Sequence, residues 1–294
     1  MTATLERPPV RAAAPEARRR RGGVLPTLVL LVGAVYCLVP VVWVFVATTK
    51  APSELFSTFT FAPGTGLLGN LGDLFTYNGG QFVLWALNSL LYSGVGALLS
   101  TFVSSMAGYA LAKYEFPGRQ VLFYGILAGV LIPGITLAVP QYLLLSQLGL
   151  AGHPLSVLIP VIISPFGIYL CRVYAASAVP QETIEAARID GASEWRIYRS
   201  IAVPLLLPGM VTVFLLQFIG IWNNFLLPYI MLSDQSDYPL TVGLFTLLAR
   251  GSGAPALYSL AITGAAVSIV PLVALVLFLQ RYWRLDLISG GIKG

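Results

Sequence analysis

Side chains that could carry out acid–base, nucleophilic or redox chemistry are few in this sequence and far apart. The only histidine, His153, stands beside Pro154 in a short connection, with no acid, cysteine or second histidine near it to form a dyad. Cys37 and Cys171 lie in apolar runs and give neither a disulfide framework nor a paired metal-ligand spacing. A G-x-x-x-x-G-K-S/T nucleotide loop is also missing. The sequence therefore predicts a protein that is not an enzyme and holds no metal or cofactor of its own.

A second set of side chains could bind a solute without transforming it. Carboxamides suit the hydroxyl groups of a sugar, and aromatic faces suit the C–H faces of its rings. The same residue types also bond membrane helices to one another or mark the lipid interface, and the sequence leaves these alternatives open. The denser group comprises Gln217, Trp222, Asn223, Asn224 and Tyr229, and a smaller group comprises Asn88, Ser89, Tyr92 and Ser93.

The stretch EAARIDGASEWRIYRSIAVP, from Glu185 to Pro204, is the most polar passage in the second half of the chain. After Pro180 it predicts a short helix over Gln181 to Ile189 that stops at Asp190 and Gly191, because glycine can take the left-handed conformation at a helix end. Ser193 is expected to cap a second helix that runs to about Ala202, before Pro204. Its large apolar side chains, of a kind that enters a groove in a partner, are Trp195, Ile197, Tyr198 and Ile201.

The remainder of the chain is strongly apolar. It has 294 residues, of which 57% are hydrophobic and only 10% charged, with a mean hydropathy of +0.82. Soluble domains are about 25% charged, and a membrane-spanning helix needs roughly 20 mostly apolar residues. The sequence therefore predicts an all-α membrane protein with six transmembrane helices. Its uncharged runs are Val24 to Thr49, Gln81 to Ala112, Gln120 to about Gln141, Pro154 to Cys171 with an extension toward Val179, Leu205 to Leu232, and Gly251 to Gln280.

Lysine and arginine predict the orientation of these spans. With the N-terminus in the cytoplasm, all but two of the 17 basic residues fall on the inside, and only Lys50 and Arg250 face outward. Both termini are therefore expected in the cytoplasm. Residues 1–23, rich in Ala, Pro and Arg, are expected to form a disordered basic cytoplasmic tail, and residues 282–294 a cytoplasmic C-terminal tail. The net charge of +5 is then a signal of topology, and no nucleic-acid partner is expected.

The six runs contain no Asp, Glu, Lys, Arg or His. An ion-coupled carrier usually places ionisable groups inside the membrane, because they bind the coupling ion. Sodium sites can be built from carbonyls and hydroxyls alone, so a secondary transporter stays an alternative, as does a membrane scaffold. In the preferred interpretation the energy for transport enters from outside this chain.

The polar stretch carries a family resemblance. The spacing of Glu185-Ala186-Ala187, Gly191, Ile201 and Val203-Pro204 resembles the EAA loop of ABC importer permeases, with Val203 where that family usually has Leu. The string EAARIDGAS is similar to the version in carbohydrate permeases of the maltose type, the MalG-like half. Three further strings resemble the family, namely SPFGIYL from Ser164, WNNFLLP from Trp222 and the ending QRYWRLDLISGGIKG. Many relatives have Glu where this chain has Asn224, which leaves that residue's contacts open.

The resemblance implies a type I (MetI/MalG-like) permease fold over residues 24–281, with a coupling loop at 180–204. It implies a multi-pass protein of a prokaryotic plasma membrane that pairs with a second, MalF-like permease, two ATPase subunits that bind ATP and Mg, and an extracytoplasmic solute-binding protein or lipoprotein. Glu185 would contact the ATPase. Ala186, Ala187 and Ala192 would pack closely, Asp190 and Gly191 would form the turn, and Trp195, Ile197 and Tyr198 would seat the loop. Ordinary helix formation or packing within this subunit is the alternative for each of these residues, above all for Trp195 and Tyr198.

The expected solute is a disaccharide or oligosaccharide such as trehalose or a maltodextrin, and glycerol-3-phosphate or another polyol is the alternative. In the maltose-type family this kind of subunit leaves most sugar contacts to its partner permease. The outward loops, Lys50 to Gly80 and Ser233 to Arg250, carry turn signals and are expected to receive the binding protein. A disordered or lipid-surface role is the alternative for the first of these loops.

Overall fold

The computed structural model describes residues 24–250 and 254–289, with side chains up to residue 282, and this part of the chain is helical without strands. The predicted tail over residues 1–23 and the last residues of the C-terminal tail lie outside the described residues. The helices are α1 (Val24–Thr48), α2 (Leu67–Thr76), η1 (Tyr77–Gly79), α3 (Gln81–Lys113), α4 (Arg119–Val130), α5 (Gly134–Gln147), α6 (Leu155–Ile162), α7 (Pro165–Ala178), α8 (Gln181–Ile189), α9 (Glu194–Ile197), η2 (Tyr198–Ala202), α10 (Val203–Trp222), α11 (Leu226–Met231), η3 (Gln235–Asp237), α12 (Leu240–Arg250) and α13 (Pro255–Ser289).

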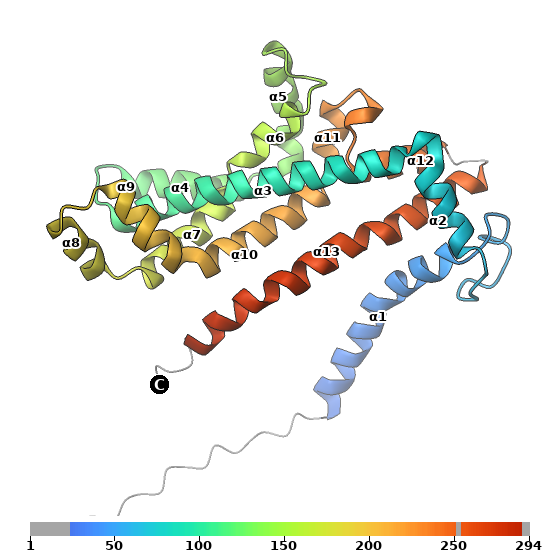
Figure 1. The fold of residues 1–294 in the computed structure, drawn as a ribbon, viewed down its shortest axis with the longest axis horizontal. Helices are drawn as coiled ribbons and strands as arrows, with labels where there is room; N and C mark the ends of the chain where they lie inside the picture. The colour runs from blue at the N-terminus through green and yellow to red at the C-terminus, as the bar shows by residue number, and fades with distance from the viewer. Residues whose placement is uncertain (1–23, 251–253, 290–294) are drawn as a thin grey trace, which may run out of the picture. The chain divides into compact units, whose positions relative to one another are not determined.

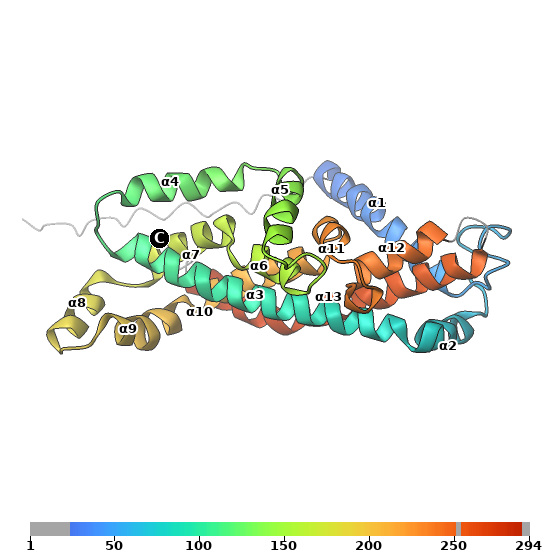
Figure 2. The same ribbon diagram turned by 90° about the horizontal axis from the view of Figure 1, so that it is seen from above.

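The chain divides into two compact units within α1, at Trp43 and Val44. The described part of the first unit, residues 24–43, is helix throughout and carries only uncharged residues. The second unit contains all the other helices. In it α3, α10 and α13 run lengthwise, with α8 and α9 at one end and α2 and α12 at the other (Figures 1 and 2).

Five helical segments of the described chain are long and apolar enough to cross a membrane, and a sharply bent pair, α4 and α5, supplies a sixth. The prediction of six spans in an all-α membrane protein is thus confirmed. The third run was predicted as one continuous span, and this is wrong, because α4 and α5 meet at 102°. Pro133 lacks an N–H group and lies in extended backbone at the break, with φ −60° and ψ 126°.

The fifth span differs from its prediction at both ends. Residues Glu194 to Trp222 form one helical segment, so the second short helix of the polar stretch does not stop before Pro204 but continues into α10. A π-helical turn, η2, lies just before Pro204, where the Val203 N–H donates to the Tyr198 carbonyl. At the other end the helix stops at Trp222 and not at Leu232, and the separate helix α11 follows.

Close packing of α3 against α7 and α10 forms the centre of the second unit. Small residues make this approach possible. A Cβ atom on Gly108 would lie 2.6 Å from the Arg172 backbone nitrogen and from the Cys171 Cβ, and one on Gly167 would lie 2.6 Å from the Ser104 Oγ. Ser93, Ser100 and Ser104 are fully buried on the same helix. Helices in lipid associate through such close contacts, because burial from water supplies no driving force there.

Hydrogen bonds hold both predicted outward loops, the first to its own flank and the second to α3. In the first, the Lys50 ammonium is buried and donates to the Phe59 carbonyl at 2.7 Å, while the Asn70 amide donates to the carbonyls of Thr48 and Lys50. Each loop also contains a helix, α2 in the first and α12 in the second. The loops therefore present fixed surfaces at the end of the molecule away from α8 and α9.

Candidate functional site

The turn between α8 and α9 has the geometry of a Schellman motif. Gly191 is left-handed, with φ +76°, as the sequence predicts. The Ala192 N–H donates to the Ala187 carbonyl and the Gly191 N–H to the Arg188 carbonyl, each at 3.0 Å. Ser193 caps the next helix by accepting the Arg196 N–H at 3.4 Å. Local sequence signals therefore build a two-helix hairpin, residues 180–204, which we call the polar hairpin.

An apolar cluster holds the polar hairpin onto the ends of α3 and α7. Ile184 from α8 and Ile197 from α9 are fully buried, and Tyr198 is 5% exposed. They pack with Tyr109 and Val179, and Ala187 and Ala192 lie partly buried at the edge of the cluster. The Tyr198 hydroxyl also lies 2.7 Å from the Ser105 hydroxyl. Ile197 and Tyr198, which the sequence offers as anchors for a partner, thus pack within this chain.

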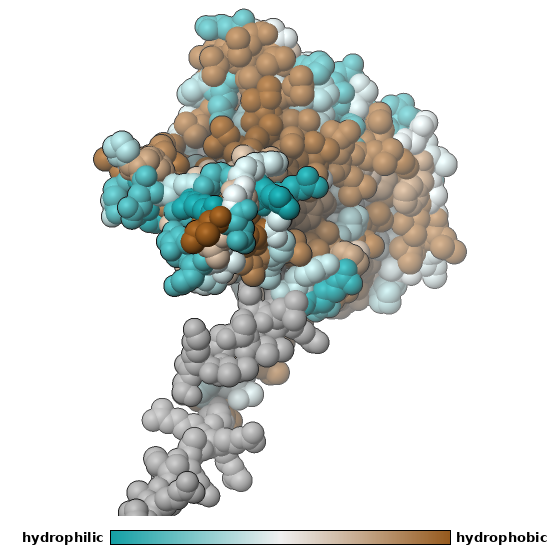
Figure 3. Space-filling view, turned by 60° about the vertical axis from the view of Figure 1, so that its left-hand side comes forward, coloured by the Kyte–Doolittle hydropathy of each residue, from teal (hydrophilic) through white to brown (hydrophobic). Residues whose placement is uncertain are grey.

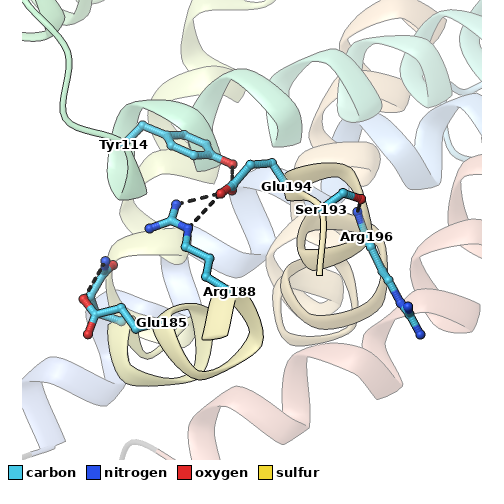
Figure 4. A network of polar contacts seen from close by, with 7 residues as sticks. Tyr114, Glu185, Arg188, Ser193, Glu194 and Arg196 are labelled. Carbon is cyan, nitrogen blue, oxygen red and sulfur yellow. Dashed lines mark hydrogen bonds and ion pairs between the residues drawn. The ribbon is translucent and has the colours of Figure 1, made fainter. Parts of the chain in front are cut away.

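Three side chains tie the two helices of the polar hairpin to each other and to α3 (Figure 4). The Arg188 Nε donates to the Glu194 Oε1 at 2.7 Å, and the Tyr114 hydroxyl donates to the Glu194 Oε2 at 2.6 Å. Hydrogen bonding to Glu194 raises the pKa of the Arg188 guanidinium, and burial together with the same carboxylate raises the pKa of Tyr114. We call this set the Arg188–Glu194–Tyr114 clasp. It orients the hairpin relative to the end of α3.

A double-mutant cycle should measure the ionic part of the clasp. The Arg188 and Glu194 side chains are 37% and 49% exposed, so solvent screens the pair. We therefore expect only a small coupling free energy between Arg188→Ala and Glu194→Ala. The readout is amide hydrogen exchange of Ile197 in the purified protein. The coupling should shrink in high salt, and strictly additive effects at low salt would contradict the pairing.

The outer face of the polar hairpin is available to a partner. Figure 3, with this end of the molecule turned forward, shows hydrophilic residues gathered over it, whereas hydrophobic residues cover much of the rest of the surface. Glu185, Ala186, Asp190 and Gly191 are all exposed there, and Gln181 donates to the Glu185 carboxylate at 3.3 Å. Trp195 is 54% exposed.

Ile189 is an exposed apolar residue of this surface that sequence reasoning did not single out. Its side chain is 86% exposed at the end of α8, directly before the turn. Ile189, like Trp195, is thus a large apolar side chain exposed on the polar hairpin.

The residues proposed for solute contact in the fifth span do not form one cluster. Gln217 donates to the Ser164 hydroxyl at 2.5 Å, which itself caps α7. Trp222 is buried and stacks on Phe218 at 5.8 Å, and Tyr229 packs on Phe225 at 5.0 Å. Asn223 is exposed and bonds to its own helix, while Asn224 lines a cavity of about 450 Å³. Asn224 is thus the one member of this group that lines this cavity.

The group on the second span holds the outward loop that precedes α12. The Asn88 amide donates to the carbonyls of Ser236 and Tyr238 at 2.6 and 3.1 Å, and the Tyr92 hydroxyl donates to the Asp237 carbonyl at 2.9 Å. The Leu240 N–H donates to Ser89, whose carbonyl accepts the Ser93 hydroxyl. These hydrogen bonds hold parts of this chain together. The sequence left such a role open as the alternative to contact with a solute.

The fold and the site together define a class of protein. Apolar helices that span a membrane, interrupted by a polar hairpin at one end and ordered loops at the other, are the features of an integral-membrane transport component. The profile of one family, described as the inner membrane component of binding-protein-dependent transport systems, matches residues 100–285. The chain belongs to this family, which confirms the predicted permease class and a multi-pass location in the plasma membrane.

Individual relatives agree with this assignment. The chain is 36% identical, over 87% of its length and 91% of the relative's, to the arabinooligosaccharides transport system permease protein AraQ of Halalkalibacterium halodurans. It is 32% identical, over 76% and 74% of the two chains, to the diacetylchitobiose uptake system permease protein NgcG of Streptomyces coelicolor. A chain in the crystal structure of a bacterial ABC transporter that imports the acidic polysaccharide alginate is 23% identical, with a TM-score of 0.78 over 88% of this chain and 95% of that one. This likeness confirms the type I ABC importer permease fold.

Proposed function

We propose that this chain is one of two permease subunits of an ATP-driven importer for a disaccharide or oligosaccharide, and that the polar hairpin couples it to a cytoplasmic ATPase. The observation that carries the proposal is the polar hairpin. It exposes Glu185, Ile189 and Asp190 at its outer face and continues without a break into a 29-residue helix. The relatives AraQ and NgcG, named for oligosaccharide systems, support a sugar as the solute.

The partners follow from the same proposal. A second, MalF-like permease completes the passage, and two ATPase subunits bind ATP and Mg and receive the polar hairpin of each permease. An extracytoplasmic binding protein delivers the sugar to the ordered outward loops. The basic residues Arg188, Arg196 and Arg199 of the hairpin support a cytoplasmic position for it, and hence for both termini.

The test is sugar-stimulated ATP hydrolysis by the complex that co-purifies with this chain, with loaded binding protein present. The solutes are arabinotriose, diacetylchitobiose, trehalose, maltotriose and glycerol-3-phosphate. Glu185→Lys reverses an exposed charge on the hairpin and is expected to lower the stimulation about tenfold, because a charged contact with a partner contributes roughly 1.5–3 kcal/mol.

Glu115→Lys is the matched control, since Glu115 is an exposed acid beyond the end of α3 and outside the hairpin. It should behave like the parent. Absence of an ATPase from the purified complex, or equal stimulation in all three proteins, would refute the coupling role.

A further inference from the structure

Three interruptions of the spans meet at one place in the second unit. The helix α5 begins after the break at Pro133, α6 ends at Ile162, and α11 begins after the end of α10. These three helices contact one another, and Figures 1 and 2 show them side by side. They border the cavity of about 450 Å³ that Asn224 lines. Cavities of roughly 300–1,000 Å³ are the usual size for small-molecule sites.

Two carboxamides at this cavity have unused hydrogen-bonding groups. Gln141 on α5 is partly buried and lines the cavity, and no other described residue bonds to its amide. Asn224 faces the same space, and its Oδ1 accepts the Leu227 N–H at 3.4 Å, whereas its Nδ2 group has no partner among the described residues.

The backbone around these amides is fixed and adds further donors. The Thr241 hydroxyl donates to the Asn224 carbonyl at 2.8 Å, which holds that residue in place after the end of α10. Gly134 and Ile135, at the start of α5, also line the cavity, and N–H groups in the first turn of a helix have no partner within it. Polar groups that have no partner in the protein favour a ligand that can bond to them.

The remaining lining is aliphatic and uncharged. Pro160, Val161 and Leu227 are among these residues, and the set contains no Asp, Glu, Lys, Arg or His. An anion such as a sugar acid or a sugar phosphate would lose its hydration here without gaining a cationic partner. A neutral sugar carries hydroxyl groups for the amides and C–H groups for the aliphatic wall.

We propose that Gln141 and Asn224 form a binding subsite for an uncharged hydroxylated solute of one or two sugar rings within this subunit. This rests on the proposed function and adds to it a location and a preference for neutral over anionic solutes. It assigns to this subunit solute contacts that the resemblance leaves mostly to the partner permease. Gln141 was not among the residues expected from the sequence.

The first arm of the test measures uptake into proteoliposomes containing the full complex, at saturating loaded binding protein. The probes are the four neutral sugars and glycerol-3-phosphate named above. Gln141→Ala and Asn224→Ala should each lower uptake of the neutral sugar about tenfold, because each removes a hydrogen bond to the solute. Gln147→Ala is the matched control, being an exposed amide on the same helix as Gln141, and should stay within about twofold of the parent.

A second arm of the test measures occupancy of the cavity directly. Asn224→Cys, in a background with Cys37→Ser, is labelled with a water-soluble maleimide, and millimolar neutral sugar should slow the labelling while glycerol-3-phosphate should not. Labelling of Gln147→Cys should be unaffected by either. Size-exclusion profiles identical to the parent's exclude misassembly as a cause.

The outcomes separate the two proposals. If the parent imports a neutral sugar but the Gln141 and Asn224 variants match their controls, the subsite is wrong and the proposed function stands. If the parent imports none of the probes, the importer assignment fails, and the absence of protection at Asn224→Cys would overturn the subsite as well. Import of glycerol-3-phosphate alone would overturn the preference for neutral solutes.

Discussion

Replacing Gly191 by valine is expected to lower sugar-stimulated ATP hydrolysis about tenfold, whereas asparagine at the same position should leave most of it intact. Gly191 has φ +76° at the hairpin turn, and a Cβ atom there would meet no other atom within 4 Å. The effect is therefore conformational and not steric. A left-handed backbone costs a residue with a Cβ roughly 1–2 kcal/mol, about a tenfold change in the population of the correct turn, and asparagine tolerates it better than valine.

The measurement compares parent, Gly191→Val and Gly191→Asn in one ATPase assay, with transport measured in parallel. Equal loss in both variants would show that the glycine is needed for contact with a partner rather than for the turn. If both variants keep the sugar-stimulated ATP hydrolysis of the parent, the conformation of the turn does not control coupling.

Gly108→Leu is expected to destabilise the protein more than any other single change described above. The Cβ atom alone would lie 2.6 Å from the Arg172 backbone nitrogen, and backbone cannot move aside as a side chain can. Overpacking of this kind costs about 3 kcal/mol, which corresponds to a fall of roughly 6–12 °C in the melting temperature.

Gly94→Leu provides the matched control, because Gly94 lies on the same helix and a Cβ atom added there would meet no other atom within 4 Å. Thermal unfolding of the detergent-purified protein should separate the two variants. Similar melting temperatures would mean that α3 and α7 are not held as closely as the glycine contact requires.

The polar hairpin could be predicted from the sequence because its signals are local. A proline before α8, a glycine after it and a serine before α9 each act on backbone within a few residues. Burial could not be predicted in the same way, since Ile197 and Trp195 are both apolar and two residues apart, yet one is fully buried and the other is 54% exposed. Ile197 is buried because it lies on the side of the helix that faces α3 and α7. The position of those two helices is a feature of the tertiary structure, which local sequence signals do not give.

The clasp and the cavity lay beyond prediction for a related reason. Tyr114 is 80 residues from Glu194 along the chain, and Gln141 and Asn224 are still further apart. Proline did not identify the breaks either. Pro140 and Pro271 lie within continuous helices, whereas Pro133 accompanies a 102° bend. Neighbouring helices can satisfy the carbonyls that a proline frees, so the residue alone does not determine whether a span breaks.

The continuous helical segment from Glu194 to Trp222 has the polar hairpin at one end and the cavity at the other, so it can act as a lever between them. Its 29 residues span about 43 Å at 1.5 Å per residue. A tilt of about 5° with the hairpin as pivot would carry the far end, next to Asn224, through about 4 Å. The π turn over Tyr198–Ala202 is where the regular hydrogen bonding of this lever is interrupted, close to its pivot. A small rotation at the hairpin end would thereby be amplified at Asn224, next to the point where the helix ends.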